Sequence, residues 1–367
     1  MKKIFYFLIV TGSLLFSCNS EIKQGDLLEI PVDITQNISL PLSEITEDLT
    51  SVEMELTDES LINIDEIILI IVLKDYIFLM QEDILVFDRS GIFIRKIGSK
   101  GQGPGEYNNL CNMTVDEINK RLFIVSHSPS KIICYNFDGK LLNESLINYA
   151  YIYDINFINE ELLVVGDKYE KNGVINSAMY RLGEGFNVKD TFTLWSTPLG
   201  DVTTFATSAS NKDFILNNNS IVFLFFSNNL FLRGPNPAKT ILRDTLYRFG
   251  ENRLVPELKL KFKDNGIDSE GKRFIDLFNI YRSSRYVFSN YQNNMDKNRY
   301  YFCYDTKTGK GYNMQGGYTD DINGIEKRIR IRPLITDAEM FYYLYTHMKP
   351  DDFEEPNPTL YIGKLKK

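Results

Sequence analysis

The chain has 367 residues, of which 13% are aromatic, and a formal net charge of −8. This acidic balance disfavours a nucleic-acid partner, and none is expected, because the neutralisation of phosphates requires a clustered basic surface. With 12 prolines and 23 glycines, the chain contains no long low-complexity linker on which a domain boundary could fall. One continuous domain is therefore favoured.

The first residues have the pattern of a bacterial export signal. Lys2 and Lys3 supply positive charge, and the apolar stretch after them is too short to favour a stable membrane span. The stretch ends in Leu15-Phe16-Ser17-Cys18, which resembles the lipobox of bacterial lipoproteins, where the cysteine is lipidated and becomes the first residue after cleavage. An ordinary secretory signal is the alternative, because Phe16 is bulkier than the small residue usual at that position. We expect a lipoprotein signal peptide over 1–17, a lipidated tether and lead-in segment over 18–40, and one folded domain over 41–367.

A unit of two apolar strands joined by a polar turn recurs along the folded part. The clearest copies are residues 75–91 and 121–139, in which the second strand ends in an aromatic residue before a turn with glycine. Four looser copies follow, at residues 162–183, 221–250, 286–309 and 341–363. Their first strands are about 40 to 65 residues apart, the spacing of four-stranded propeller blades. We therefore predict an all-β fold, a six-bladed β-propeller of four-stranded antiparallel blades, in which stacked blades build one core.

A strand near the start of the folded part can close the ring. Residues 49–56 alternate apolar Val52, Met54 and Leu56 with polar neighbours, as a half-buried strand does. We expect this strand to join the last blade beside residues 360–363. The ring would then be held by both ends of the chain and would leave no open sheet edge.

A glycine-rich segment follows the first copy, and it carries a family resemblance. Its residues are Gly101, Gly103, Pro104, Gly105, Glu106 and Tyr107. Together with Phe87-Asp88-Arg89-Ser90-Gly91, the segment resembles the blade-ending signature of six-bladed β-propeller lipoproteins of Bacteroides-type bacteria, which are distantly similar to NHL-repeat propellers. The opening at 43–56 and the ending at 357–365 are similar to that family as well. The resemblance covers the mature chain and implies no catalytic residue.

We interpret the same segment as a structural crossover between two blades. It is not a phosphate-binding loop, because no Lys-Ser/Thr pair follows, no helix begins there and Pro104 removes a backbone donor. The glycines would supply positive φ angles, and Glu106 would accept hydrogen bonds from backbone N–H groups of the neighbouring blade. The alternative is that Glu106 and Tyr107 face a ligand at the rim.

Residues suited to catalysis or metal binding are scarce. The only histidines are His127 and His347, whereas propeller enzymes that use a metal or a Ser-His-Asp triad need several converging polar groups. Cys134 and Cys303 lie in strand-like runs and are expected to be buried small residues. We therefore predict no catalytic residue and no metal ligand.

Two acidic clusters are the remaining candidates for an ion. Asp320-Asp321 and the segment Asp351-Asp352-Phe353-Glu354-Glu355 could offer oxygen atoms to calcium, but neither has the alternating spacing of a dedicated loop. Solvated connections between blades are the favoured interpretation, and no cofactor is expected.

These observations lead to a functional hypothesis. We expect a monomeric, non-catalytic binding module that is lipid-anchored to the outer membrane, facing the periplasm or the cell surface. Its ligand would be a glycan, a peptide or another envelope protein. The alternative is an envelope hydrolase or lyase acting on glycans or peptides at the central channel. Exposed tyrosines such as Tyr149 and Tyr151 could stack on sugar rings, although tyrosines in strands more often pack between blades.

Overall fold

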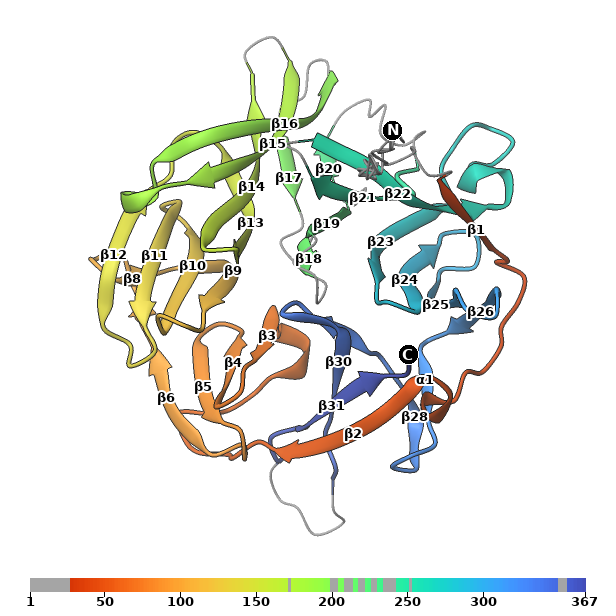
Figure 1. Ribbon diagram of the computed structural model, residues 1–367, viewed down its shortest axis with the longest axis horizontal. Helices are drawn as coiled ribbons and strands as arrows, with labels where there is room; N and C mark the ends of the chain where they lie inside the picture. The colour runs from red at the N-terminus through yellow and green to blue at the C-terminus, as the bar shows by residue number, and fades with distance from the viewer. Residues whose placement is uncertain are drawn as a thin grey trace, which may run out of the picture.

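Strands form nearly all of the regular structure in the computed structural model, and they build six small sheets arranged in a ring (Figure 1). The structure describes residues 27–170, 173–198, 204–207, 214–216, 222–225, 230–233, 242–250, 253–348 and 355–367. The prediction of an all-β, six-bladed β-propeller is confirmed.

Each blade contains four antiparallel strands, and its first strand lies nearest the centre of the ring (Figure 1). Blade 1 consists of β3 (Leu69–Val72), β4 (Tyr76–Met80), β5 (Ile84–Asp88) and β6 (Phe93–Ile97). Blade 2 consists of β9 (Asn109–Asp116), β10 (Arg121–His127), β11 (Lys131–Asn136) and β12 (Leu141–Leu146). Blade 3 consists of β13 (Tyr151–Ile158), β14 (Glu161–Tyr169), β15 (Val174–Leu182) and β16 (Val188–Pro198).

The second half of the ring repeats this plan. Blade 4 consists of β18 (Phe214–Leu216), β19 (Val222–Phe225), β21 (Thr245–Gly250) and β22 (Arg253–Phe262). Blade 5 consists of β23 (Ile275–Arg282), β24 (Tyr286–Asn293), β25 (Asn298–Asp305) and β26 (Lys310–Gln315). Blade 6 consists of β29 (Arg332–Leu334), β30 (Asp337–Tyr345), β31 (Thr359–Leu365) and β2 (Thr46–Glu53).

The six predicted copies supply the two middle strands of the six blades. In blade 1, for example, β4 and β5 pair with Ile77 opposite Phe87, and both residues are fully buried. These strands are covered on both faces by adjacent blades, so their apolar runs are the most continuous and the easiest to detect.

The core lies between the blades. Phe78 of blade 1 and Tyr135 of blade 2 belong to one buried cluster, and Leu79 of blade 1 shares another with Leu360 of blade 6. The other clusters likewise join neighbouring blades. Each blade therefore depends on its neighbours for burial of its apolar faces.

The predicted closure of the ring is also confirmed. β2 pairs antiparallel with β31, so that Val52 lies opposite Leu360 and Leu49 opposite Gly363. Blade 6 thus combines three strands from the end of the chain with one from near its beginning, and its outer edge is β2 (Figure 1).

An additional strand precedes the ring. β1 (Leu28–Val32) pairs in parallel with β22 as a fifth strand of blade 4, with Ile30 and Val32 buried. The chain then crosses the outer side of blade 5, where the Ile38 backbone N–H donates to the Asn313 carbonyl at 2.8 Å. We call residues 28–41 the N-terminal strap; it ends at α1 (Leu42–Ile45), directly before β2 (Figure 1).

The remaining elements are short. They are β7 (Ser99–Lys100), β8 (Glu106–Tyr107), β17 (Thr204–Thr207), β20 (Leu230–Arg233), β27 (Tyr318–Asp320), β28 (Ile325–Ile329) and the 3-10 turns Ile64–Glu66, Glu184–Phe186 and Lys263–Gly266. Within the described residues, no helix combines the length and the apolar character needed to span a membrane.

Candidate ligand-binding site

The glycine-rich segment connects the outermost strand of blade 1, β6, to the innermost strand of blade 2, β9. Its turn is closed by the Glu106 carboxylate, which accepts the Gly103 backbone N–H at 2.8 Å. Gly101 has a φ of 153°, and a Cβ atom there would lie 2.0 Å from Glu106 Oε2. The turn therefore requires glycine at position 101 both for its backbone conformation and for space.

Blade 2 holds this crossover through a buried cation. Lys131 is 4% exposed, and its Nζ donates to the Gly103 carbonyl at 3.1 Å and to Glu144 Oε2 at 3.3 Å. The same Glu144 oxygen accepts the Gly105 backbone N–H at 2.9 Å, and the Tyr135 hydroxyl donates to the Gly105 carbonyl. The prediction that Glu106 accepts hydrogen bonds from the neighbouring blade is therefore wrong, because Glu106 accepts one within its own turn. The carboxylate that joins the crossover to blade 2 is that of Glu144.

Tyr107 lies beneath the crossover. Its side chain is 0% exposed, and its hydroxyl donates to the Ile97 carbonyl at 3.3 Å. Burial raises the pKa of Tyr107 well above its usual range. The phenol therefore stays protonated and packs in the core between blades 1 and 2, away from the rim.

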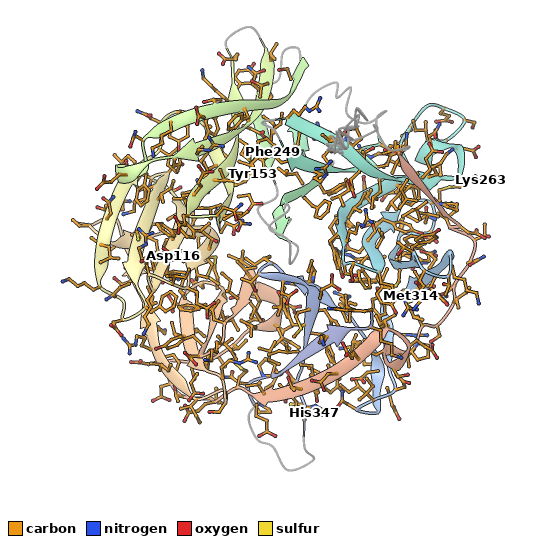
Figure 2. All side chains as sticks on the ribbon, in the orientation of Figure 1. Asp116, Tyr153, Phe249, Lys263, Met314 and His347 are labelled. Atoms are coloured by element: carbon orange, nitrogen blue, oxygen red, sulfur yellow. The ribbon has the colours of Figure 1, made fainter. Side chains whose placement is uncertain are left out.

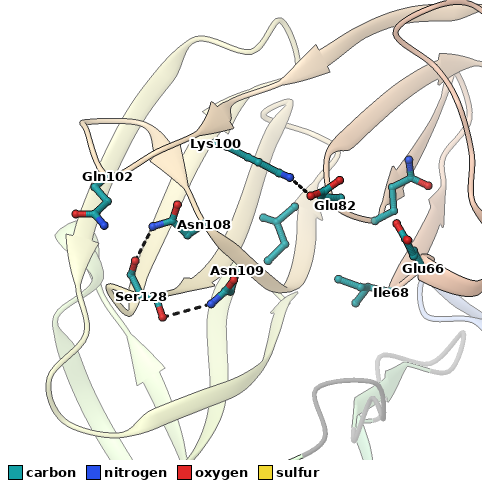
Figure 3. A pocket seen from close by; sticks show the side chains of 10 residues that line it. Glu66, Ile68, Glu82, Lys100, Gln102, Asn108, Asn109 and Ser128 are labelled. Carbon is teal, nitrogen blue, oxygen red and sulfur yellow. Dashed lines mark hydrogen bonds and ion pairs between the residues drawn. The ribbon is translucent and has the colours of Figure 1, made fainter.

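A pocket of about 760 Å³ lies beside the crossover (Figure 3). Its lining comes from the lead-in to β3, the β4–β5 turn, the crossover with the start of β9, and the β10–β11 turn. The lining residues are Glu66, Ile68, Gln81, Glu82, Lys100, Gln102, Asn108, Asn109, Leu110 and Ser128. Four side-chain amides and a single ion pair make this a polar site.

The polar groups of the pocket are positioned by hydrogen bonds among themselves and with the backbone. Lys100 Nζ forms an ion pair with Glu82 (Figure 3). Asn108 Nδ2 donates to the Ser128 carbonyl at 2.7 Å, and Asn109 Nδ2 donates to Ser128 Oγ at 3.3 Å. Gln81 is fixed because its Nε2 donates to the Leu61 carbonyl at 2.8 Å. The pocket is therefore largely preformed.

An aromatic pair adjoins the pocket. The His127 ring stacks on Tyr151 of blade 3, with centroids 4.2 Å apart and planes at 9°. His127 lies opposite Asn109 in the β9–β10 pairing and directly precedes Ser128, so the stack lies next to two lining residues of the pocket, on the blade 3 side. Neither ring of the stack is itself among the lining residues. Burial lowers the pKa of His127, which keeps its ring neutral at pH 7.

Other predicted candidates have structural surroundings. The Asp320 carboxylate accepts hydrogen bonds from the backbone N–H groups of Ile322 and Asn323 and from the Tyr343 hydroxyl. Asp321 accepts the Ser43 backbone N–H at 3.0 Å. The Asp320 carboxylate thus stabilises its own turn, and the Asp321 carboxylate connects that turn to α1.

Cys18 and residues 351–354 lie outside the described residues. Cys134 and Cys303 are buried, as predicted, and burial raises the pKa of the Cys134 thiol to about 11. His347 shares a 2.7 Å hydrogen bond with the Tyr361 hydroxyl. Within the part of the chain that the structure describes, no three His, Cys, Asp or Glu side chains group as metal ligands.

A further buried carboxyl lies in blade 3. Asp167 is 3% exposed and accepts a hydrogen bond from the Ser177 hydroxyl. Desolvation raises the pKa of Asp167 from 3.8 to about 6, although Ser177, Arg243 and Tyr153 favour its charged form. Sequence reasoning did not single out this residue, because only the fold shows that it is buried.

The pocket itself was also missed from the sequence. Its residues come from four connections that are distant along the chain, and polar residues in turns carry no signal of their own. Gln102 lies within the glycine-rich crossover, and Lys100 and Asn108 flank its glycines. This crossover is the one part of the site that the sequence pattern indicated.

The chain is similar to several solved structures. A structure from Bacteroides fragilis NCTC 9343, described as a "Putative exported protein", has a TM-score of 0.64 at 17% identity and covers 93% of this chain and 100% of its own. A DUF4221 family member from Bacteroides vulgatus has a TM-score of 0.43 at 11% identity, covering 88% of this chain and 97% of its own. The WD40 repeats of RRP9 have a TM-score of 0.45 at 9% identity, covering 90% and 100%.

The comparison with curated proteins gives no match. A family model, described as a domain of unknown function (DUF4934), matches residues 27–367, which is the whole propeller together with its N-terminal strap. The chain belongs to the DUF4934 family.

Proposed function

We propose that this protein is a lipid-anchored envelope protein whose propeller binds a polar ligand without chemically changing it. The pocket between blades 1 and 2 carries the proposal. It is preformed, it is lined by four side-chain amides, and the connections that line it are held by hydrogen bonds. Amide side chains bind and orient polar ligands, whereas they are poor nucleophiles and poor general acids or bases.

The proposed location rests on the N-terminal sequence. Lys2, Lys3, the apolar stretch and Cys18 together form an export signal with a lipidation site, followed by a short tether. The description of the Bacteroides fragilis protein as exported supports the same location for this chain. We also propose that the blades are distantly similar to NHL repeats.

Ligand binding can be tested with a pocket variant. Protein produced from the full chain and purified in detergent is screened by calorimetry against neutral oligosaccharides, acidic oligosaccharides and peptides. Gln102→Trp places a large ring on an exposed position of the pocket lining, and Asn143→Trp, on an exposed position of β12, is the matched control. We expect one ligand class to bind the natural protein and the control but not Gln102→Trp. If no class binds, or if Gln102→Trp binds as well as the control, the pocket is not the binding site; recovery of a cleaved ligand would favour the hydrolase or lyase.

The anchor is tested separately. Cys18→Ser should move the protein from the membrane fraction to the soluble fraction, and the natural protein should carry a diacylglyceryl mass on its first residue. An unchanged membrane fraction for Cys18→Ser would contradict lipidation at this position.

A further inference from the structure

We propose that the pocket and the adjoining His127–Tyr151 stack recognise an uncharged oligosaccharide. This inference rests on the proposed binding function and names the ligand class for the same site. Three features carry it: the hydrogen-bonding groups left available in the pocket, the sign of its charge, and the aromatic surface beside it.

The available hydrogen-bonding groups match hydroxyls. Among the described residues, the Gln102 amide has no hydrogen-bond partner, while Asn108 and Asn109 use their Nδ2 atoms on Ser128 and keep their Oδ1 atoms available. The site thus offers both donors and acceptors on planar amide groups. Adjacent hydroxyls of a sugar ring donate and accept in the same way, so the Gln102 amide, with both of its ends available, can hold two of them.

The charge of the pocket disfavours an acidic ligand. The ammonium of Lys100 is already paired with Glu82, and Glu66 adds a second carboxylate to the lining. The stacked His127 adds no positive charge at pH 7, since burial lowers its pKa. The whole chain carries a net charge of −8, which repels anions further. Uronic-acid and sulfated oligosaccharides should therefore bind less tightly than neutral ones.

The stack supplies the apolar contact that a sugar needs. Tyr151 is 37% exposed, and the His127 ring fixes its orientation from one side. The C–H face of a pyranose ring packs against such an aromatic surface, while its hydroxyls reach polar groups at its edge. The pocket volume of about 760 Å³ lies within the range of small-molecule sites.

The test uses defined probes and four variants. Neutral hexose oligosaccharides of two to six units, oligogalacturonates of the same lengths and uncharged peptides are titrated into the full protein in detergent. Tyr151→Ala removes the stacking surface and Tyr151→Phe retains it. Gln102→Ala removes one unpartnered amide, and Asn143→Ala is the control. All three positions are exposed, so folding should be preserved, and thermal unfolding checks this.

We expect a neutral oligosaccharide to bind the natural protein, Tyr151→Phe and Asn143→Ala with similar affinity. Tyr151→Ala should weaken binding about tenfold and Gln102→Ala about fivefold. Binding of peptides alone, lost in Gln102→Trp, would overturn the oligosaccharide assignment and leave the binding function standing. If neutral oligosaccharides bind Tyr151→Ala and Gln102→Ala as tightly as the natural protein, they bind at another site, and the inference is overturned. If no probe binds, both proposals are overturned.

A fifth variant tests the charge argument directly. Glu82→Gln removes the partner of Lys100 at an exposed position and leaves the ammonium available for a carboxylate. We expect oligogalacturonate affinity to rise several-fold at low ionic strength, with little change for the neutral probe. Tighter binding of oligogalacturonate than of neutral probes by the natural protein would contradict the inference.

Discussion

Two buried carboxyl groups have pKa values shifted in opposite directions, because one has a cationic partner and the other is mainly desolvated. The Arg285 guanidinium donates to Asp305 at 3.0 and 2.7 Å and also reaches the Lys367 carbonyl at the chain end. This pairing lowers the pKa of Asp305 from 3.8 to about 2, whereas burial raises that of Asp167 to about 6. The two residues should therefore contribute opposite pH dependences to stability.

Asp305→Asn should reduce the free energy of unfolding by on the order of 2 kcal/mol at pH 7. The folded-state pKa is lower than the unfolded one, so the stabilisation is present above about pH 4 and disappears as the pH falls through about 2. Urea unfolding at several pH values measures the difference, with Asp58→Asn at an exposed loop position as the control. If the difference in unfolding free energy between Asp305→Asn and the natural protein stays constant from pH 7 to pH 2.5, the ion pair does not contribute to stability.

Asp167→Asn should show the opposite behaviour. The folded-state pKa of about 6 exceeds the unfolded value of 3.8, so this group stabilises the fold below about pH 4 and loses that contribution as the pH rises through about 6. The natural protein should thereby lose on the order of 3 kcal/mol between pH 4 and pH 7, and the variant should lack this part of the decline. Unfolding curves of the two proteins that stay parallel across this range would exclude Asp167 as the titrating group.

The crossover between blades 1 and 2 connects local backbone geometry with the pocket. Lys100, Gln102 and Asn108 of the pocket all belong to this segment, and the segment is fixed by Glu106 from within and by Lys131 and Glu144 from blade 2. A change that opens the turn should therefore alter ligand binding as well as stability.

Gly101→Ala should lower the free energy of unfolding by about 2 to 4 kcal/mol, because the new Cβ atom clashes with the Glu106 carboxylate and the backbone has a positive φ that disfavours side chains. Gly185→Ala is the matched control, since Gly185 also has a positive φ but has no atom within 4 Å of the new Cβ, and it should cost about 1 kcal/mol. Unfolding measures the stability, and hydrogen exchange should show faster exchange at 98–108 only in the first variant. If the two substitutions lower the free energy of unfolding equally, the Glu106 side chain moves away from the new Cβ atom without loss of stability.

Strands were easier to predict from the sequence than the surfaces that they create. The middle strands of the blades were found because residues such as Ile77 and Phe87 form unbroken apolar runs, and the closing strand was found because Val52 and Met54 alternate with polar residues. β1 was not found, because five residues that include Pro31 give a weak pattern, and its partner β22 is distant along the chain. The pocket was not found because it exists only where four connections meet.

At the scale of the whole molecule, the strap and the pocket lie on opposite sides of the ring. β1 lies on the outer edge of blade 4, whereas the pocket lies between blades 1 and 2 (Figures 1 and 3). Residues labelled across the ring, such as Asp116 on blade 2 and Lys263 after β22, show this separation (Figure 2). A domain of this length is about 50 Å across, whereas residues 18–28 can span at most about 36 Å.

The proposed lipid at Cys18 should therefore hold blade 4 near the membrane and direct the pocket away from it. We expect a fluorophore on Lys263→Cys to be quenched strongly by a headgroup quencher in vesicles that contain the lipidated protein, and one on Gln102→Cys to be quenched weakly. Ile30→Asp places a charge at a fully buried position of β1, which should release the strap and reduce this difference. Because β1 lies outside the closed ring of blades, the variant should stay folded, which thermal unfolding checks. Equal quenching at both labels in the natural protein would mean that the strap does not orient the propeller.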